Sequence, residues 1–192
     1  MRITSIIGAL AVLMTAAFVD ADLTWVPWET TAGGNNHEYA LAATGANWAA
    51  HQATAESLGG YLATMKTEAE NAFVTDNILH LTSNHWMGLY DADGDNGDFR
   101  IGWEWVGGDP LEYDSEEGWQ EWVNWADGQP DGYTGGNWGG YAHIHGSDGK
   151  WRDWQGGANY WAVYERPVPE PGTLLLMLCG VATVGLKRRL QS

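Results

Sequence analysis

Asn124-Trp125-Ala126-Asp127-Gly128-Gln129-Pro130-Asp131 is a turn segment that contains a tryptophan. A second segment with a tryptophan and an acid, Trp151-Arg152-Asp153, lies further along the chain. Proline fixes its own φ and biases the preceding residue towards extended geometry, so Gln129 and Asp131 are expected to present oxygens from a rigid loop. Asp153 follows a strand-like run and can add a carboxylate from a facing strand. Amide and carboxylate oxygens suit calcium and also sugar hydroxyls. The two segments therefore predict a ligand site. The alternative is an Asp-rich surface turn beside core tryptophans, because Asp and Gly are common in turns.

Tryptophan is unusually frequent in this chain, with 13 Trp against 3 Phe, and 26 of the 192 residues are glycine. This composition indicates a loop-rich, aromatic-packed β or α+β domain and argues against a helical bundle or a disordered chain. Tryptophan also stacks on sugar rings, so its excess favours carbohydrate binding. The formal net charge of −16 would repel phosphate backbones, which argues against a nucleic-acid partner.

The N-terminal end has the layout of a secretory signal peptide. Met1-Arg2 supplies a positive start and residues 3–18 form an apolar run. Small or aliphatic residues in Val19-Asp20-Ala21 predict cleavage before Asp22, so residues 1–21 would be removed. The alternative is an N-terminal membrane anchor.

The C-terminal end combines Pro169-Glu170-Pro171, an apolar run at 172–186 and the basic cluster Lys187-Arg188-Arg189. As a helix the apolar run would measure about 22 Å, which is short of the roughly 30 Å hydrocarbon core. Residues 167–192 resemble the PEP-CTERM sorting signal of Gram-negative bacteria. The resemblance implies export to the cell envelope or extracellular surface and transient anchorage in the inner membrane. It also implies that an exosortase-type membrane protease recognises Pro169, Glu170 and Pro171.

The chain has a single cysteine, Cys179, and it lies inside the apolar run of the tail. The exported domain is therefore expected to contain no disulfide, although its compartment would permit one.

The region between the two ends predicts an α+β fold. Residues 22–36 are expected to form a lead-in strand and linker, and residues 37–42 the first strand. A helical pattern opens at Asn47 and ends at Gly59-Gly60, where glycine suits the helix terminus. Thr67-Glu68-Ala69-Glu70 resembles a capping box and predicts the start of a second helix. Short aromatic strands between Gly- and Asp-rich loops are expected beyond it.

A series of motifs follows this order along residues 37–166. They are Trp48, Leu58-Gly59-Gly60, Leu62-Ala63-Thr64, Glu70-Asn71-Ala72-Phe73-Val74, Trp86-Met87-Gly88-Leu89, Trp103-Glu104-Trp105, Asn124-Trp125, Gln129-Pro130-Asp131, Trp151-Arg152-Asp153 and Ala162-Val163-Tyr164-Glu165. In register they resemble the C-type lectin-like domain. The resemblance implies two helices packed on small antiparallel sheets, with a long loop that carries the ligand site.

The resemblance also implies two pairs of cysteines that this chain lacks. Their positions fall at Ala55 with Tyr164 and at Tyr141 with Gly156. Aromatic and small-residue packing must then replace about 2–4 kcal/mol of stability per disulfide.

The ligand set of that family is only partly present. A Gln-Pro-Asp triplet goes with galactose-type sugars there, and a later glutamate and the Asn-Asp of Trp-Asn-Asp complete the calcium site. Here the glutamate position falls on or near Gly139, and Arg152 stands at the asparagine position. Calcium takes about six to eight oxygens, and the three remaining side chains, Gln129, Asp131 and Asp153, supply fewer. A Ca²⁺ site is therefore one of two alternatives. An Arg152–Asp131 ion pair is the alternative.

These observations predict a non-enzymatic, exported binding module for extracellular polysaccharide or another glycan. The expected sugar-binding residues are Gln129, Asp131, Asp153, Trp125, Trp138 and Trp151, with the tryptophans as stacking platforms and the first three residues as the metal ligands if calcium binds. Gly139 and Arg152 motivate the alternative of a structural or protein-recognition module with a dead sugar site. A secreted carbohydrate hydrolase is the third reading, although no pattern places two acids across a cleft.

Two further patterns suggest cation sites. The acidic run at 91–98 begins like an EF-hand, but Asn96 stands where the turn glycine belongs and Gly102 where the glutamate belongs, so a hairpin loop is predicted. His143 and His145 share one face of an expected strand and could ligate zinc with a nearby aspartate. The alternatives are a solvated strand face, or a histidine that contacts a sugar.

Overall fold

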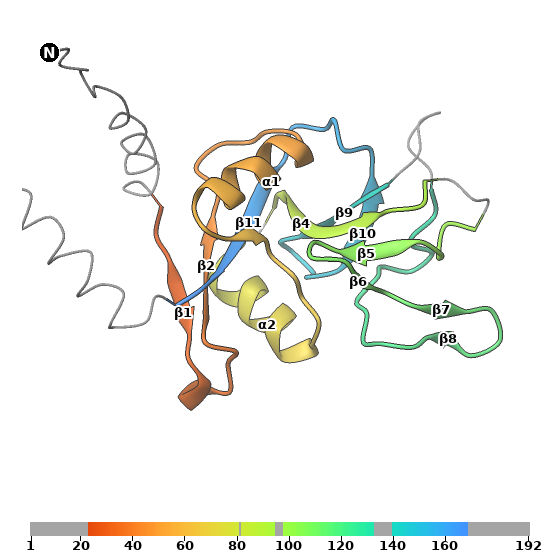
Figure 1. Ribbon diagram of the computed structural model, residues 1–192, viewed down its shortest axis with the longest axis horizontal. Helices are drawn as coiled ribbons and strands as arrows, with labels where there is room; N and C mark the ends of the chain where they lie inside the picture. Colours follow the sequence, from red (N-terminus) through yellow and green to blue (C-terminus); the bar gives the residue numbers. More distant parts are fainter. Residues whose placement is uncertain (1–22, 81, 95–97, 133–139, 169–192) are drawn as a thin grey trace, which may run out of the picture.

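The computed structural model describes residues 23–80, 82–94, 98–132 and 140–168 (Figure 1). The helical elements are η2 (Thr30–Ala32), α1 (Trp48–Ser57) and α2 (Glu68–Asn77). The strands are β1 (Val26–Trp28), β2 (His37–Leu41), β3 (Tyr61–Leu62), β4 (Asn84–Asp91), β5 (Trp103–Trp105), β6 (Asp109–Pro110), β7 (Tyr113–Asp114), β8 (Gly118–Trp119), β9 (Tyr141–His145), β10 (Trp151–Trp154) and β11 (Trp161–Pro167).

The last strand, β11, lies in the middle of the sheet and joins its two halves. It pairs antiparallel with β2 along one edge, and along the other edge it pairs antiparallel with β3 and parallel with β4. From β4 the sheet branches, because this strand pairs with β5 and also with β9, and β9 pairs in turn with β10. The β9–β10 branch carries Asp153. The sheet topology places this residue beside the loop that carries Gln129 and Asp131. The predicted α+β class is confirmed, and among the described strands β11 and β4 run parallel while the other pairs are antiparallel (Figure 1).

Both predicted helix starts are confirmed by their caps. Asn47 Oδ1 accepts from Ala50 N–H at 2.8 Å, and Thr67 Oγ1 accepts from Glu70 N–H at 3.1 Å. Glu70 makes only a variant of the expected capping box, because its carboxylate accepts from Lys66 N–H and from the hydroxyl of Tyr39. A buried carboxylate on α2 therefore ties this helix to β2.

Helix α1 ends just before Gly59-Gly60, as the sequence predicted. Gly59 adopts φ of 78°, a left-handed conformation that L side chains rarely adopt. Gly60 N–H donates to the carbonyl of Ala55 at 3.0 Å, which closes the last turn.

The tryptophans form much of the hydrophobic core. Trp125 packs edge-on against Trp103 with ring centroids 4.9 Å apart, and against Trp151 at 5.8 Å. Trp105 also meets Trp151 edge-on at 5.7 Å. Large aromatic side chains bury much apolar area, so this cluster stabilises the loop-rich half of the domain.

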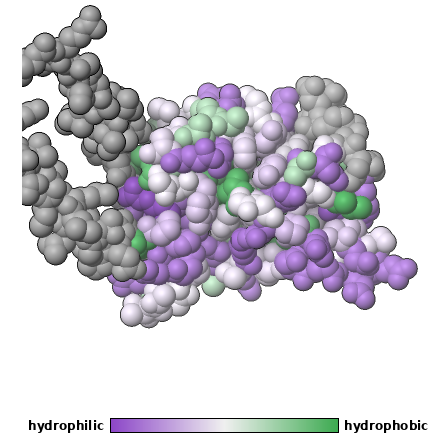
Figure 2. Space-filling model, in the orientation of Figure 1, coloured by the Kyte–Doolittle hydropathy of each residue, from purple (hydrophilic) through white to green (hydrophobic). Residues whose placement is uncertain are grey.

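The face of the domain shown in Figure 2 is mostly polar. On the face shown in Figure 2 hydrophilic residues dominate and hydrophobic ones are scattered. Within the described residues, Phe99 and Ile101 are the large hydrophobic side chains that stand exposed, at 37% and 44%. A few exposed hydrophobic side chains of this kind are normal on a protein surface.

Aromatic packing occupies the positions at which the resemblance implied cysteines. The ring of Tyr141 lies against Gly156, where an added Cβ would come within 2.5 Å of the Cδ2 and Cε2 atoms of the ring. Ala55 and Tyr164 are buried in one cluster, and the hydroxyl of Tyr164 lies 2.7 Å from His51 Nδ1. Side-chain packing thus links the segments at both positions.

Candidate functional site

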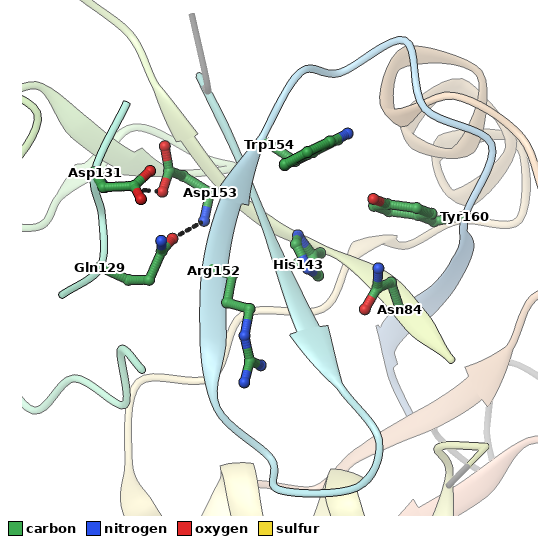
Figure 3. A pocket seen from close by; sticks show the side chains of 8 residues that line it. All are labelled: Asn84, Gln129, Asp131, His143, Arg152, Asp153, Trp154 and Tyr160. Atoms are coloured by element: carbon green, nitrogen blue, oxygen red, sulfur yellow. Dashed lines mark hydrogen bonds between the residues drawn. The ribbon is translucent and has the colours of Figure 1, made fainter. Parts of the chain in front are cut away.

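The loop that carries Gln129 and Asp131 is held against β10 by Asp153. One carboxylate oxygen of Asp153 accepts from Asp131 N–H at 3.0 Å, and the other accepts from Gly132 N–H at 2.9 Å. In return Asp153 N–H donates to Gln129 Oε1 at 3.0 Å. The structure therefore brings together Gln129, Asp131 and Asp153, as the sequence predicted (Figure 3).

Backbone pairing places the start of the loop beside the same strand. Trp151 N–H donates to the carbonyl of Asn124 at 2.9 Å, and Ala126 N–H donates to the carbonyl of Trp151 at 2.9 Å. The Gln129–Pro130 peptide is cis, and Pro130 is buried. The two segments that the sequence analysis singled out thus form one continuous structure.

Asp153 is a buried carboxylate, with only 2% of the residue exposed. Burial raises its pKa above the usual value, the nearby charge of Asp131 adds to the rise, and the backbone N–H groups of Asp131 and Gly132 oppose it. Asp131 itself is exposed, so its carboxylate borders the solvent side of the site.

The described residues do not make up a calcium shell. They offer one amide oxygen and two carboxylates, and both oxygens of Asp153 and the Oε1 of Gln129 already accept backbone N–H groups. Calcium takes about six to eight oxygens. No cluster of three or more His, Cys, Asp or Glu residues suited to a metal occurs in the part of the chain that the structure describes. Within the described residues, the hydrogen bonds of Asp153 hold the loop against β10.

Arg152 points away from Asp131 and does not form the ion pair considered from the sequence (Figure 3). Its guanidinium Nη2 donates to Asp148 Oδ2 at 2.7 Å, and Nη1 donates to the carbonyl of Lys150 at 3.3 Å. The guanidinium of Arg152 is therefore paired with Asp148 rather than with Asp131.

The expectation that Trp125 and Trp151 are stacking platforms is wrong. Trp151 is 0% exposed and Trp125 is 9% exposed, because both rings belong to the hydrophobic core. Trp151 Nε1 donates to Asn71 Oδ1 at 2.7 Å, so its polar edge also points inward. Neither ring therefore has a face open for a sugar to stack on.

A pocket of about 330 Å³ is lined by residues of β4, β9, β10, the Gln129–Asp131 loop and the segment before β11. Its lining residues are Asn84, Gln129, Asp131, His143, Arg152, Asp153, Trp154 and Tyr160 (Figure 3). This volume lies in the range typical of small-molecule sites. The three loop and strand residues predicted from sequence form one end of the pocket, and His143, Trp154 and Tyr160 form the other.

The aromatic end of the pocket was not predicted as such. Alternation along β9 and β10 puts His143 and Trp154 on the face that packs beside Trp86 and Tyr160, while Ala142, Ile144 and Trp151 face the larger hydrophobic cluster. Both faces of β10 carry a tryptophan, so the alternation alone could not show which one borders the pocket. His143 lines the pocket and His145 does not, which separates two histidines that the sequence treated alike.

The acidic run after β4 is part of a hairpin, as predicted, since β4 and β5 pair antiparallel with Leu89 opposite Trp105. Asp93 N–H donates to Asp91 Oδ1 at 3.2 Å within this turn. Burial, followed by the hydrogen bond and charge of Asp93, raises the pKa of Asp91 to about 6.

Several sequence predictions fall outside the described residues. They are the signal peptide at 1–21, the apolar run at 172–186, the sorting motif Pro169-Glu170-Pro171, and the site positions Trp138 and Gly139. Among the residues that are described, no helix has the length and apolar character needed to cross a bilayer.

Comparison with known proteins identifies relatives by sequence. The family model "Lectin C-type domain" matches residues 44–160. Human C-type lectin domain family 10 member A is 33% identical over 118 residues, which are 60% of this chain and 32% of that protein. The bovine secretory phospholipase A2 receptor is 34% identical over 67 residues, which are 35% of this chain and 4% of the receptor. The chain thus spans about a third or less of the length of these relatives.

Solved structures share the fold at low sequence identity. The carbohydrate-recognition domain of the mouse scavenger receptor C-type lectin matches with a TM-score of 0.59 and 20% identity, over 76% of this chain and 96% of that domain. The cow CD23 domain matches with a TM-score of 0.58 and 22% identity, over 76% and 95%. A calcium-independent type II antifreeze protein matches with a TM-score of 0.56 and 17% identity, over 76% and 95%. With a family match over more than half of its length and this fold, the chain belongs to the lectin C-type domain family.

Proposed function

We propose that this chain is an exported cell-surface binding module whose pocket recognises carbohydrate. The observation that carries the proposal is the convergence of Gln129, Asp131 and Asp153 beside the partly exposed rings of Trp154 and Tyr160. Sugars combine a rim of hydroxyl groups with apolar C–H faces. A pocket with polar oxygens at one end and aromatic rings at the other matches both features.

The oxygens of the site suit hydroxyl donors. Asp131 is exposed at the mouth of the pocket and its carboxylate is an acceptor. The side-chain amide of Gln129 adds a donor as well as an acceptor, and Asp153 fixes the position of both residues. A loop held in its binding geometry loses less entropy when a ligand binds.

Related domains support a glycan ligand and leave the role of calcium open. The cow CD23 domain was solved in the presence of a GlcNAc2Man3 oligosaccharide, and a murine dendritic cell inhibitory receptor domain in complex with an N-glycan. Lectin C-type domains are in general binding domains, so we propose no catalytic activity for this chain. Since the described oxygens do not form a calcium shell, we propose that binding does not require Ca²⁺.

A glycan array followed by calorimetric titration of the positive sugars tests this function. We expect binding of galactose-type sugars both in calcium and in EDTA. Asp131→Ala should weaken binding about tenfold or more, because it removes an acceptor but keeps the backbone N–H bond to Asp153. Asp127→Ala is the matched control, since this exposed aspartate lies on the same loop and outside the pocket. An array without any bound sugar would overturn the proposal.

A second candidate is a structural or protein-recognition module with a dead sugar site. The observation that favours it is that three oxygens of the site already accept backbone N–H groups. The fold of a calcium-independent antifreeze protein is also similar. Absence of sugar binding together with a stable, folded domain would select this candidate.

Export and sorting are a separate part of the proposal. We propose that residues 1–21 direct export and that an exosortase-type protease recognises Pro169-Glu170-Pro171 and removes the tail. The intact mass of the protein extracted from the cell surface tests both steps. A mass that retains residues 172–192 would contradict removal of the tail.

A further inference from the structure

The pocket is longer than the loop site from which the sugar-binding function was proposed. It runs from Gln129 and Asp131 across β10 and β9 to Asn84 on β4 (Figure 3). Arg152 on β10 is opposite His143 on β9, and Asn84 on β4 is opposite His145. Two strand spacings amount to about 10 Å, which is more than one sugar ring covers.

His143 forms the floor of the far end. It is 3% exposed, its ring lies 5.2 Å from that of Tyr160, and Trp86 meets it edge-on at 6.0 Å. Within the described residues its Nδ1 atom is buried without a hydrogen-bond partner. Buried polar atoms are nearly always paired, so this nitrogen is an exception that a ligand could satisfy.

The chemistry of this end matches an uncharged hydroxyl compound. Burial, followed by the charge of Arg152, lowers the pKa of His143 to about 3, so the ring is neutral at ordinary pH. A neutral imidazole has one donor and one acceptor nitrogen, which is the complement of a sugar hydroxyl. Trp154 and Tyr160 are partly exposed and can pack on the C–H faces of a ring.

The charges around the pocket argue against an acidic sugar. Asp131 and Asp153 are two carboxylates at the loop end. Arg152 is the cationic residue among those that line the pocket, and its guanidinium is paired with Asp148 at 2.7 Å. The carboxylate of a uronate would be repelled by Asp131 and Asp153 at one end of the pocket. At the other end, the guanidinium of Arg152 is already paired with Asp148.

We propose that the ligand is an uncharged oligosaccharide that occupies two subsites. One sugar lies at Gln129, Asp131 and Asp153, and the next packs between Trp154 and Tyr160 while one of its hydroxyls bonds to the imidazole of His143. This inference rests on the proposed carbohydrate-binding function and extends it to the size and charge of the ligand.

Calorimetric titration of the full-length protein with galactose and with a galactose disaccharide tests the inference. We expect the disaccharide to bind at least tenfold more tightly than galactose. His143→Phe keeps an aromatic ring but removes both nitrogens, so it should weaken disaccharide binding about tenfold and galactose binding much less. Trp154→Ala provides a second test at the same subsite and should reduce the same preference.

The control is His145→Phe, which changes the next histidine on the same strand face but lies outside the pocket. It should leave both affinities unchanged, and thermal melts should show that each variant is folded. Equal affinity for the two sugars, or equal loss of both in His143→Phe and Trp154→Ala, would overturn the second subsite while the proposed function stands. Failure of both sugars to bind would overturn the two together.

Discussion

Asp153 is the residue on which the geometry of the proposed site depends. Its carboxylate accepts the N–H groups of Asp131 and Gly132, and the residue is almost fully buried. Asp153→Ala would leave two N–H groups without their acceptor and would release the loop. We expect it to lower the free energy of unfolding by about 2–4 kcal/mol, measured by urea denaturation.

Asp153→Asn is the matched control for that substitution. The amide has a similar shape, but it has one acceptor oxygen instead of two and lacks the charge. It should therefore lose roughly half as much stability as Asp153→Ala. A full loss in Asp153→Ala with almost none in Asp153→Asn would show that the side chain acts by filling space rather than by holding the two N–H groups.

Calcium provides a second test at the scale of single residues. A bound ion stabilises the native state by mass action, so a calcium site would raise the melting temperature in millimolar calcium. Because the oxygens of Gln129 and Asp153 already accept N–H groups, we expect calcium and EDTA to give the same melting temperature within about 1 °C. A rise of several degrees, lost in Asp131→Ala, would contradict the absence of a calcium shell.

The residues of the site were predictable where local sequence determines their position. The Gln-Pro-Asp triplet and Asp153 could be recognised because proline restricts the loop and the acid follows a strand. Trp125 and Trp151 were assigned wrongly, because their burial depends on tertiary packing against Trp103 and Trp105. No local signal distinguishes a tryptophan that faces the core from one that faces a ligand.

At the scale of elements, packing between β9 and the loop after β10 takes the place of a covalent link. The ring of Tyr141 lies directly on Gly156, and Trp48 of α1 lies 4.9 Å from the same ring. Gly156→Ala would place a Cβ within 2.5 Å of Tyr141. We expect a loss of about 1–3 kcal/mol in unfolding free energy, because the ring has to move out of its packed position.

Gly157→Ala is the neighbouring control for the same element. No atom lies within 4 Å of the Cβ that this substitution would add. It should change the unfolding free energy by less than about 0.5 kcal/mol, as surface substitutions usually do. A similar loss in both variants would mean that the glycines matter for backbone freedom, and that contact with Tyr141 is not the cause.

Helices were more predictable than strands in this chain. Asn47, Thr67 and Gly59 act within one turn of chain, so the caps of α1 and α2 follow from local chemistry. The pairing of β11 with β2, β3 and β4 joins segments far apart in sequence. Only the resemblance of ordered motifs to a known domain predicted how such segments combine.

At the scale of the whole molecule, the interior contains histidines and carboxylates whose protonation acts on stability in opposite directions. Burial lowers the pKa of His85 to about 4, below the usual 6.5. The unfolded chain then binds a proton more readily, so His85 stabilises the fold above pH 6.5 and this contribution is lost as the pH falls towards 4. The raised pKa of Asp91, about 6, has the opposite effect: its extra stability is present below pH 3.8 and is lost as the pH rises towards 6.

These opposite signs can be separated by two substitutions measured at pH 7 and pH 5. His85→Phe removes the histidine penalty, so its unfolding free energy relative to the original protein should improve by about 2 kcal/mol between pH 7 and pH 5. Asp91→Asn should show the reverse trend, because the original protein regains stability at low pH when Asp91 takes up its proton. Denaturant titrations at both pH values provide the measurement. Parallel pH profiles for the original protein and His85→Phe would mean that His85 is accessible to protons in the native state, contrary to its burial in the sheet.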